Sequence, residues 1–331
     1  MTPWIKEIIS TKKCVNIPIL THPGIEAIGH KVIEAVKDGR VHYEAIKYLA
    51  DKYPSFACCT IMDLTVEAEA FGAEVEFTDN DLPHVLGRLV FDAEGIERLG
   101  VPSLEAARIP EYLKACRLAV ENMDRPILAG CIGPFTLAGR LYDISEIMVG
   151  IYLEPDAIKM LLDKCTQFLV AYVEEMKKLG AAGIFMAEPA AGLLSDEDCR
   201  TFSSEYVKRI VDVLQDDTFA VILHNCGNTG QCTRAMVDSR AAALHFGNVI
   251  DMKGVMAECP SDILVMGNID PVSIMKQATP EKVKETTLEL LKDMKGYSNF
   301  ALSTGCDVPP ECPVGNIEAY FEAQHEYNQS K

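Results

Sequence analysis

Residues 219–228 have the sequence FAVILHNCGN, an apolar run that ends in a histidine and a cysteine. A short apolar run of this kind is typical of a buried strand. Because side chains alternate across a strand, His224 and Cys226 should point the same way. Neutral imidazole and thiolate are donors that suit Zn²⁺. This stretch therefore predicts a strand whose carboxyl end presents two donors to one ion.

A second apolar segment, residues 299–303, precedes Cys306 in the run LSTGCDVPP. We expect this cysteine to be the third donor. Three protein ligands leave the fourth position of a tetrahedral zinc site open to substrate, which is typical of catalytic zinc. For the H-x-C pair alone, the alternative is a core histidine beside a packed thiol. Free cysteine is commonly buried, and the chain has twelve cysteines.

Short apolar runs alternate with stretches of helical period along the rest of the chain, as in repeated βα units. Helices are expected over 155–179, 195–214, 279–294 and 315–327. The expected strands end near Thr21, Asp63, Gly133, Glu188, Cys226, Gly247, Asn268 and Cys306. These units predict an α/β fold, the TIM (β/α)8 barrel. A doubly wound open sheet is the alternative, but the sequence has no G-x-G-x-x-G or P-loop to support it.

The length of 331 residues is compatible with one barrel that carries insertions. No linker rich in Pro, Ser or Gly divides the chain, so we expect a single domain over residues 1–331. The second crossover is too long for one helix and predicts an insertion around residues 66–125.

The charge balance limits the partners and the compartment. With 49 acidic and 31 basic residues the formal net charge is −18, which argues against nucleic acid and anionic membrane surfaces as partners. The amino terminus lacks the apolar core of a signal peptide, and no run of about eighteen apolar residues could span a membrane. We therefore expect a cytoplasmic protein with reduced thiols.

The active site of a TIM barrel lies at the carboxyl ends of its strands. Glu188 is expected there, as a displaceable fourth ligand, an orienting partner of His224 or an acid toward a leaving group. A solvated loop carboxylate or a helix-capping partner is the alternative. Asn268 and Asp270 also follow a strand, where a role in turn geometry is at least as expected as contact with substrate.

Five longer phrases add a family resemblance. The five phrases are MDLTVEAEAFGAEV, GPFTLAGRL, GIFMAEPAAGLLS, MGNIDPVSIM and GCDVPPECPVGNIEAY. Together they resemble the uroporphyrinogen decarboxylase superfamily, and within it the corrinoid-dependent methyltransferases such as the methylcobalamin:coenzyme M enzymes. The resemblance implies a uroporphyrinogen decarboxylase-like barrel. It also implies that His224, Cys226 and Cys306 are the zinc ligands. Decarboxylases hold their substrate with an N-terminal R-Q-A-G-R motif, whereas the corresponding segment here is LTHPGIEAIG and the first arginine is Arg40.

The resemblance further implies a zinc-dependent transfer of a methyl group between cobalamin, carried by a small corrinoid protein, and a small substrate. That substrate would be a thiol or a methylated oxygen, nitrogen or sulfur compound, and the direction of transfer stays open. This chain has no D-x-H-x-x-G cobalamin motif, so a partner must carry the cofactor. The alternatives are a metal-free decarboxylase and a non-catalytic accessory protein of a corrinoid system. A homodimer stays open.

Overall fold

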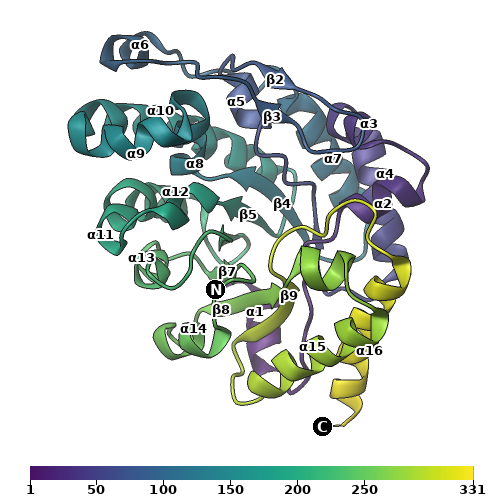
Figure 1. The fold of residues 1–331 in the computed structure, drawn as a ribbon. Coiled ribbons are helices and arrows are strands. Elements are labelled where there is room, and N and C mark those ends of the chain that lie inside the picture. Colours follow the sequence, from purple (N-terminus) through teal and green to yellow (C-terminus); the bar gives the residue numbers. More distant parts are fainter. Residues whose placement is uncertain (331) are drawn as a thin grey trace.

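The computed structural model describes residues 1–330 and shows a curved sheet of parallel strands enclosed by helices (Figure 1). Every neighbouring pair in this sheet is parallel. In spatial order the seven strands are β1 (Cys58–Cys59), β4 (Ile127–Ile132), β5 (Gly183–Ala187), β6 (Ala220–Asn225), β7 (Ala243–Phe246), β8 (Leu264–Ile269) and β9 (Phe300–Thr304). This order follows the chain, as in a TIM barrel, and the predicted fold is confirmed.

The eighth place in the barrel is filled by an extended segment and not by a regular strand. Asn16 forms an isolated parallel bridge with Leu302 of β9. On the other side, the Phe56 amide, just before β1, donates to the Asn16 carbonyl at 3.0 Å. The segment before Thr21 therefore lies at the predicted position in the barrel, but the prediction that it forms a regular strand was wrong. Pro18 has no N–H to donate, so this segment cannot complete a ladder.

Helices cover the outside of the sheet, and the four predicted helices are present. α10 (Pro155–Lys178), α15 (Pro280–Asp293) and α16 (Val314–Gln329) agree with the sequence to within a few residues. The helix predicted over 195–214 is divided into α11 (Asp196–Cys199), the wider turn η2 (Arg200–Ser204) and α12 (Glu205–Leu214). The other helices are α1 (Pro3–Ser10), α2 (His22–Ala27), α3 (Val32–Lys37), α4 (Gly39–Lys52), α8 (Pro134–Tyr142), α9 (Ile144–Leu153), α13 (Thr233–Asp238), α14 (Met252–Glu258), η1 (Pro189–Leu193) and η3 (Pro271–Lys276).

The connection between β1 and β4 is longer than a single crossover helix. It contains α5 (Val66–Ala70), the antiparallel strands β2 (Val75–Glu76) and β3 (His84–Val85), α6 (Ala93–Arg98) and α7 (Ile109–Asn122). Figure 1 shows β2, β3 and α6 at the upper edge of the molecule. Residues between β2 and β3 reach back to the barrel, as described below. That the chain forms one domain stays a prediction.

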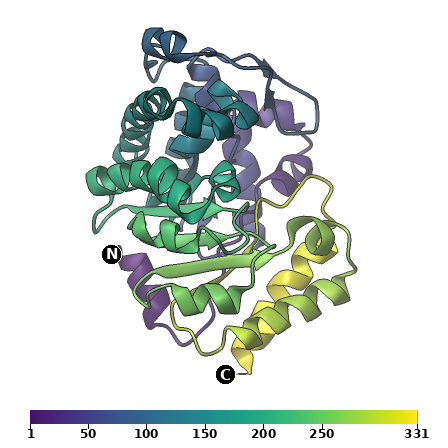
Figure 2. The ribbon, with the colours of Figure 1, turned by 60° about the vertical axis from the view of Figure 1, so that its left-hand side comes forward.

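The amino-terminal end of the barrel is closed by α1, the purple helix beside the strands in Figure 2. Trp4, Ile5 and Ile8 of this helix pack in one apolar cluster with barrel residues such as Phe185 and Ile222. The Trp4 indole N–H also donates to the Ala182 carbonyl, just before β5, at 3.3 Å. The carboxyl ends of the strands therefore form the accessible end of the barrel, which we call the mouth. None of the helices within residues 1–330 has the length and apolarity to cross a membrane.

One buried histidine makes the stability of this fold depend on pH. His42 on α4 is fully buried, its Nε2 accepts a hydrogen bond from the Ile61 amide at 2.8 Å, and burial lowers its pKa from 6.5 to about 3. Below pH 6.5 His42 is protonated in the unfolded chain but stays neutral in the folded chain. The free energy of unfolding therefore falls as the pH falls. Between pH 7.5 and pH 5 we expect His42 to account for a loss of about 2 kcal/mol. Denaturant titrations of the wild type and His42→Gln should show a shallower pH dependence in the variant, and identical slopes would contradict this assignment.

Candidate metal centre

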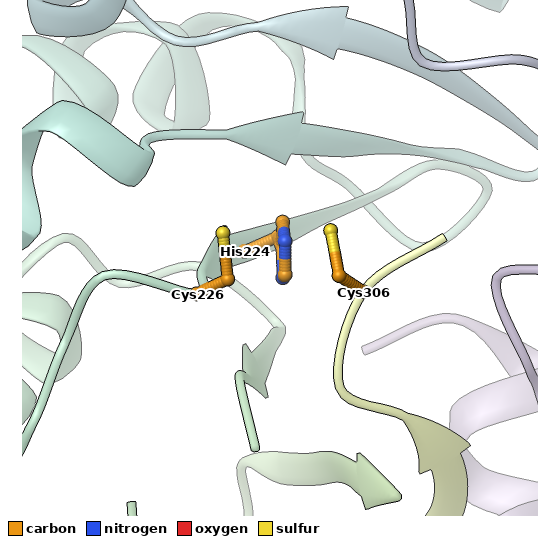
Figure 3. Close-up of side chains that lie close together, drawn as sticks. All are labelled: His224, Cys226 and Cys306. Atoms are coloured by element: carbon orange, nitrogen blue, oxygen red, sulfur yellow. The ribbon is translucent and has the colours of Figure 1, made fainter. Parts of the chain in front are cut away.

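The three predicted donors lie together at the mouth, as Figure 3 shows. His224 stands near the end of β6, Cys226 follows that strand, and Cys306 follows β9. One ligand atom from each residue lies within 4.8 Å of the other two. The His224 side chain is buried, while the two cysteines are half-buried. A small molecule entering the mouth can therefore reach the sulfur atoms.

The two thiols interact directly with each other. A hydrogen bond from the Cys306 thiol lowers the pKa of Cys226, and the same interaction raises the pKa of Cys306. Cys226 is thus the more easily deprotonated of the two thiols. A metal ion accepts thiolates and displaces such a shared proton, so two adjacent thiols of this kind form a suitable pair of ligands.

The His224 ring is held by a second histidine on the neighbouring strand. β6 and β7 pair with His224 directly beside His245, and the two Nδ1 atoms are 2.7 Å apart. Nε2 of His245 is 2.8 Å from Oγ of Ser303 on β9. Burial lowers the pKa of His245 well below its ordinary value, so this ring is neutral. A neutral His245 can accept the Nδ1 proton of His224 and donate its own Nε2 proton to Ser303.

This arrangement leaves Nε2 of His224 as a lone-pair donor. It is a buried atom, and no hydrogen-bond partner for it is present among residues 1–330. Buried polar atoms without a partner are uncommon, and each calls for a missing ion, water or ligand. With two adjacent sulfur atoms, the donor set of one imidazole and two thiols fits a zinc ion.

The donors open into a cavity of about 200 Å³. Apolar side chains dominate its wall, among them Met62 and Leu64 after β1 and Leu82 and Pro83 from the segment between β2 and β3. The connection predicted as an insertion thus contributes one side of the cavity. Its volume is below the range of about 300–1,000 Å³ of pockets that hold drug-sized ligands.

Glu188 lies outside this group of donors. Its carboxylate accepts hydrogen bonds from the Phe135 and Thr136 amides at 2.8 Å, from the Thr136 hydroxyl at 2.6 Å and from the Ser203 hydroxyl at 3.3 Å. Burial raises the pKa of Glu188. A Cβ atom at Gly133 would lie 2.2 Å from the Glu188 side chain, so the amino terminus of α8 fits closely around this carboxylate. The structure therefore gives Glu188 the helix-capping place considered as the alternative.

Other polar residues at strand ends are engaged in the fold. Asp63 is paired with Arg108 and accepts a hydrogen bond from the Tyr112 hydroxyl at 3.1 Å. The Asn268 amide donates to the carbonyls of Gly247 and Ile250, at 2.8 and 2.9 Å. Asp270 caps η3 by accepting from two backbone amides of its first turn. Asn268 and Asp270 therefore have the role in turn geometry that the sequence analysis gave as one of their two possible roles.

Two residues at the site were missed from the sequence. His245 was given no role, although its place near the end of the strand predicted to end near Gly247, like that of His224 in its own strand, was a usable signal. Arg140 lies in the phrase GPFTLAGRL, where only family resemblance was recognised. It belongs to α8 and lines the cavity together with His224, Cys226 and Cys306.

Comparison with known proteins places these features in context. A family model described as Uroporphyrinogen decarboxylase (URO-D) matches residues 18–327. Methylcobamide:CoM methyltransferase MtbA of Methanosarcina mazei is 30% identical over 271 residues, 80% of this chain and 78% of that protein. Methylated-thiol–coenzyme M methyltransferase of the same organism is 26% identical over 298 residues, which cover 86% of this chain and 78% of that protein. A solved methyltransferase structure from M. mazei superposes with a TM-score of 0.88 at 23% identity, covering 98% of this chain and 97% of that one.

Proposed function

The chain belongs to the uroporphyrinogen decarboxylase family, and on that premise we propose that it is a zinc-dependent methyltransferase that moves a methyl group between a corrinoid protein and a small substrate. The observation that carries this proposal is the group formed by His224, Cys226 and Cys306 at the mouth of the barrel. The similarity to a methylcobamide:CoM methyltransferase supports the same reaction class.

The chain's own residues suit such a reaction in three ways. His224, Cys226 and Cys306 would hold the ion, and His245 would fix the tautomer and direction of the His224 ring. The ion, when bound, supplies a positive charge that lowers the pKa of a coordinated thiol and makes its sulfur a nucleophile at neutral pH. The apolar wall that includes Met62 and Leu64 limits access of water to that sulfur.

In the direction toward a thiol, the sulfur lone pair forms the new S–CH₃ bond as the Co–C bond breaks. Both electrons of the broken bond stay on cobalt, which passes from Co(III) to Co(I), and the thiol proton is released to solvent. Glu188 takes no part in this scheme, since its carboxylate is turned to the amino terminus of α8. A small corrinoid protein is the proposed source of the methylated cobalt.

The direct test uses zinc-loaded protein, free methylcobalamin and short thiols under anaerobic conditions, with cobalt absorbance and the methylated thiol both measured. We expect conversion of methyl-Co(III) to Co(I) in step with methyl thioether formation, and no conversion with Cys306→Ser. The assay is run in both directions, with methylcobalamin and thiols and with Co(I) cobalamin and methylated thiols. Zinc binding without a change of the cobalt absorbance in either direction would contradict the proposal and favour an accessory protein. Full activity in zinc-free protein would contradict the role of the metal.

A further inference from the structure

Two buried cysteines lie together outside the group of metal donors. Cys199 is the last residue of α11, and Cys232 is the last residue of the connection that leads from β6 to α13. The helices α11 and α13 lie side by side (Figure 1). The Cys199 thiol donates a hydrogen bond to the Cys232 sulfur, so the two sulfur atoms are in direct contact.

The connection that carries Cys232 is fixed against the segment that follows β5. The Gln231 side chain donates a hydrogen bond to the Gly192 carbonyl at 2.6 Å. The Cys232 sulfur lies 3.4 Å from the carbonyl oxygens of both Ala191 and Leu194. These contacts hold the Cys232 sulfur just before α11 in space, where the Cys199 thiol meets it.

The contact between the thiols makes Cys232 the more reactive of the two. Burial raises the pKa of an isolated core thiol such as Cys116 to about 12. The hydrogen bond from Cys199 instead lowers the pKa of Cys232, and the same bond raises the pKa of Cys199. The thiolate is the form of cysteine that reacts with oxidants. The exposed residues Thr229 and Gln231 cover this sulfur, so a small oxidant needs only a local opening of their turn to reach it.

We propose that Cys199 and Cys232 form a redox modification site, at which hydrogen peroxide converts the two thiols into a disulfide. The Cys232 thiolate attacks one peroxide oxygen, the O–O bond breaks, and the hydroxide that leaves takes up a proton to become water. The Cys199 sulfur then attacks the sulfenic acid on Cys232, so that the S–S bond forms as the S–O bond breaks. The Cys199 proton leaves with that oxygen as a second water. The two thiols lose two electrons, which reduce the peroxide, and a thiol reductant reverses the modification.

The disulfide ties the connection that carries a metal donor to a neighbouring helix. Cys226 begins this connection and lines the cavity, and Cys232 ends it. Oxidation replaces a hydrogen bond by a covalent bond of about 2.05 Å between the sulfur atoms. The Ala191 carbonyl keeps a partner in the oxidised protein, because it also accepts a hydrogen bond from the Leu194 amide at 3.2 Å. Loss of the thiol proton therefore leaves this buried carbonyl satisfied.

The experiment exposes the full-length protein, incubated with zinc, to hydrogen peroxide and then alkylates the remaining thiols under denaturing conditions. We expect two alkylated cysteines fewer per chain than the twelve of the reduced protein. A disulfide should link the tryptic peptide that ends at Arg200 to the one that ends at Arg234. Fragmentation of the linked peptides should place the bond on Cys232 and not on Cys226. Dithiothreitol should restore all twelve thiols.

Cys199→Ser and Cys232→Ser should each abolish the linked peptides. Cys312→Ser is the matched control and should keep them, because Cys312 is a buried thiol outside this pair. In Cys199→Ser, dimedone should label the sulfenic acid on Cys232, whereas a label found only on Cys199 of Cys232→Ser would contradict the order of attack. The inference is overturned if the folded wild type keeps both thiols while the unfolded protein oxidises, or if its only disulfide joins Cys226 and Cys306. These peptide masses do not depend on methyl transfer, so either result leaves the proposed function intact.

Discussion

Cys306→Ser should give a folded protein that has lost its zinc. The wild type is expected to bind about one zinc ion per chain through His224, Cys226 and Cys306. Serine has nearly the same shape as cysteine but is a poor ligand for this borderline-soft ion. Changing a residue that only orients a zinc ligand weakens metal binding by 10- to 100-fold, so removal of a ligand should cost more than about 100-fold in affinity. Cys226→Ser and His224→Ala should behave alike.

The measurement is zinc content after dialysis, followed by competition with a chromogenic chelator. Cys312→Ser is a matched control, since Cys312 is buried and its thiol donates to the Met275 carbonyl at 3.1 Å, outside the donor group. His245→Gln should give an intermediate loss of about 10- to 100-fold, because it disturbs only the orientation of His224. Absence of zinc from the reconstituted wild type, or equal loss in Cys312→Ser, would contradict the proposed site.

Glu188→Ala should destabilise the fold and leave zinc binding unchanged. The substitution removes the acceptor for two amides and two hydroxyls around the amino terminus of α8. Removing one partner of a buried charged interaction typically costs about 3–5 kcal/mol. We expect the free energy of unfolding to fall by about 3 kcal/mol. Thr136→Val is the graded control, since it removes the Thr136 hydroxyl bond and should cost about 1 kcal/mol.

Urea unfolding followed by circular dichroism measures the stability, and the same samples give the zinc content. The Glu188 carboxylate bonds to the first turn of α8, whereas its contact with His224 is made by the backbone amide, which donates to the His224 carbonyl at 2.8 Å and is kept in the variant. The two readouts should therefore separate. Loss of zinc in a stably folded Glu188→Ala protein would show that the carboxylate serves the metal and not the helix.

The grouping of His224, Cys226 and Cys306 could be predicted from sequence because the relevant rule is local. Alternation along β6 turns His224 and Cys226 to the same side, and parallel strands bring the ends of β6 and β9 to the same rim. The alternation of side chains along a strand also decides the direction of Glu188, but the prediction for Glu188 did not use it. Ala187 pairs with His224 and lines the cavity, so Glu188, the next residue along, faces the other way toward α8.

By itself, the sequence predicted the barrel, seven of its strands, four of its helices and the grouping of His224, Cys226 and Cys306, because apolar periodicity and strand ends depend on neighbours along the chain. Only the tertiary structure decided which side chains surround those donors. The register of β6 against β7 sets His245 beside His224, and the packing of α8 brings Arg140 to the cavity. The irregular segment around Asn16 closes the barrel only through contacts with β9 and with the residue before β1. Such contacts join residues far apart in sequence, and local periodicity carries no information about them.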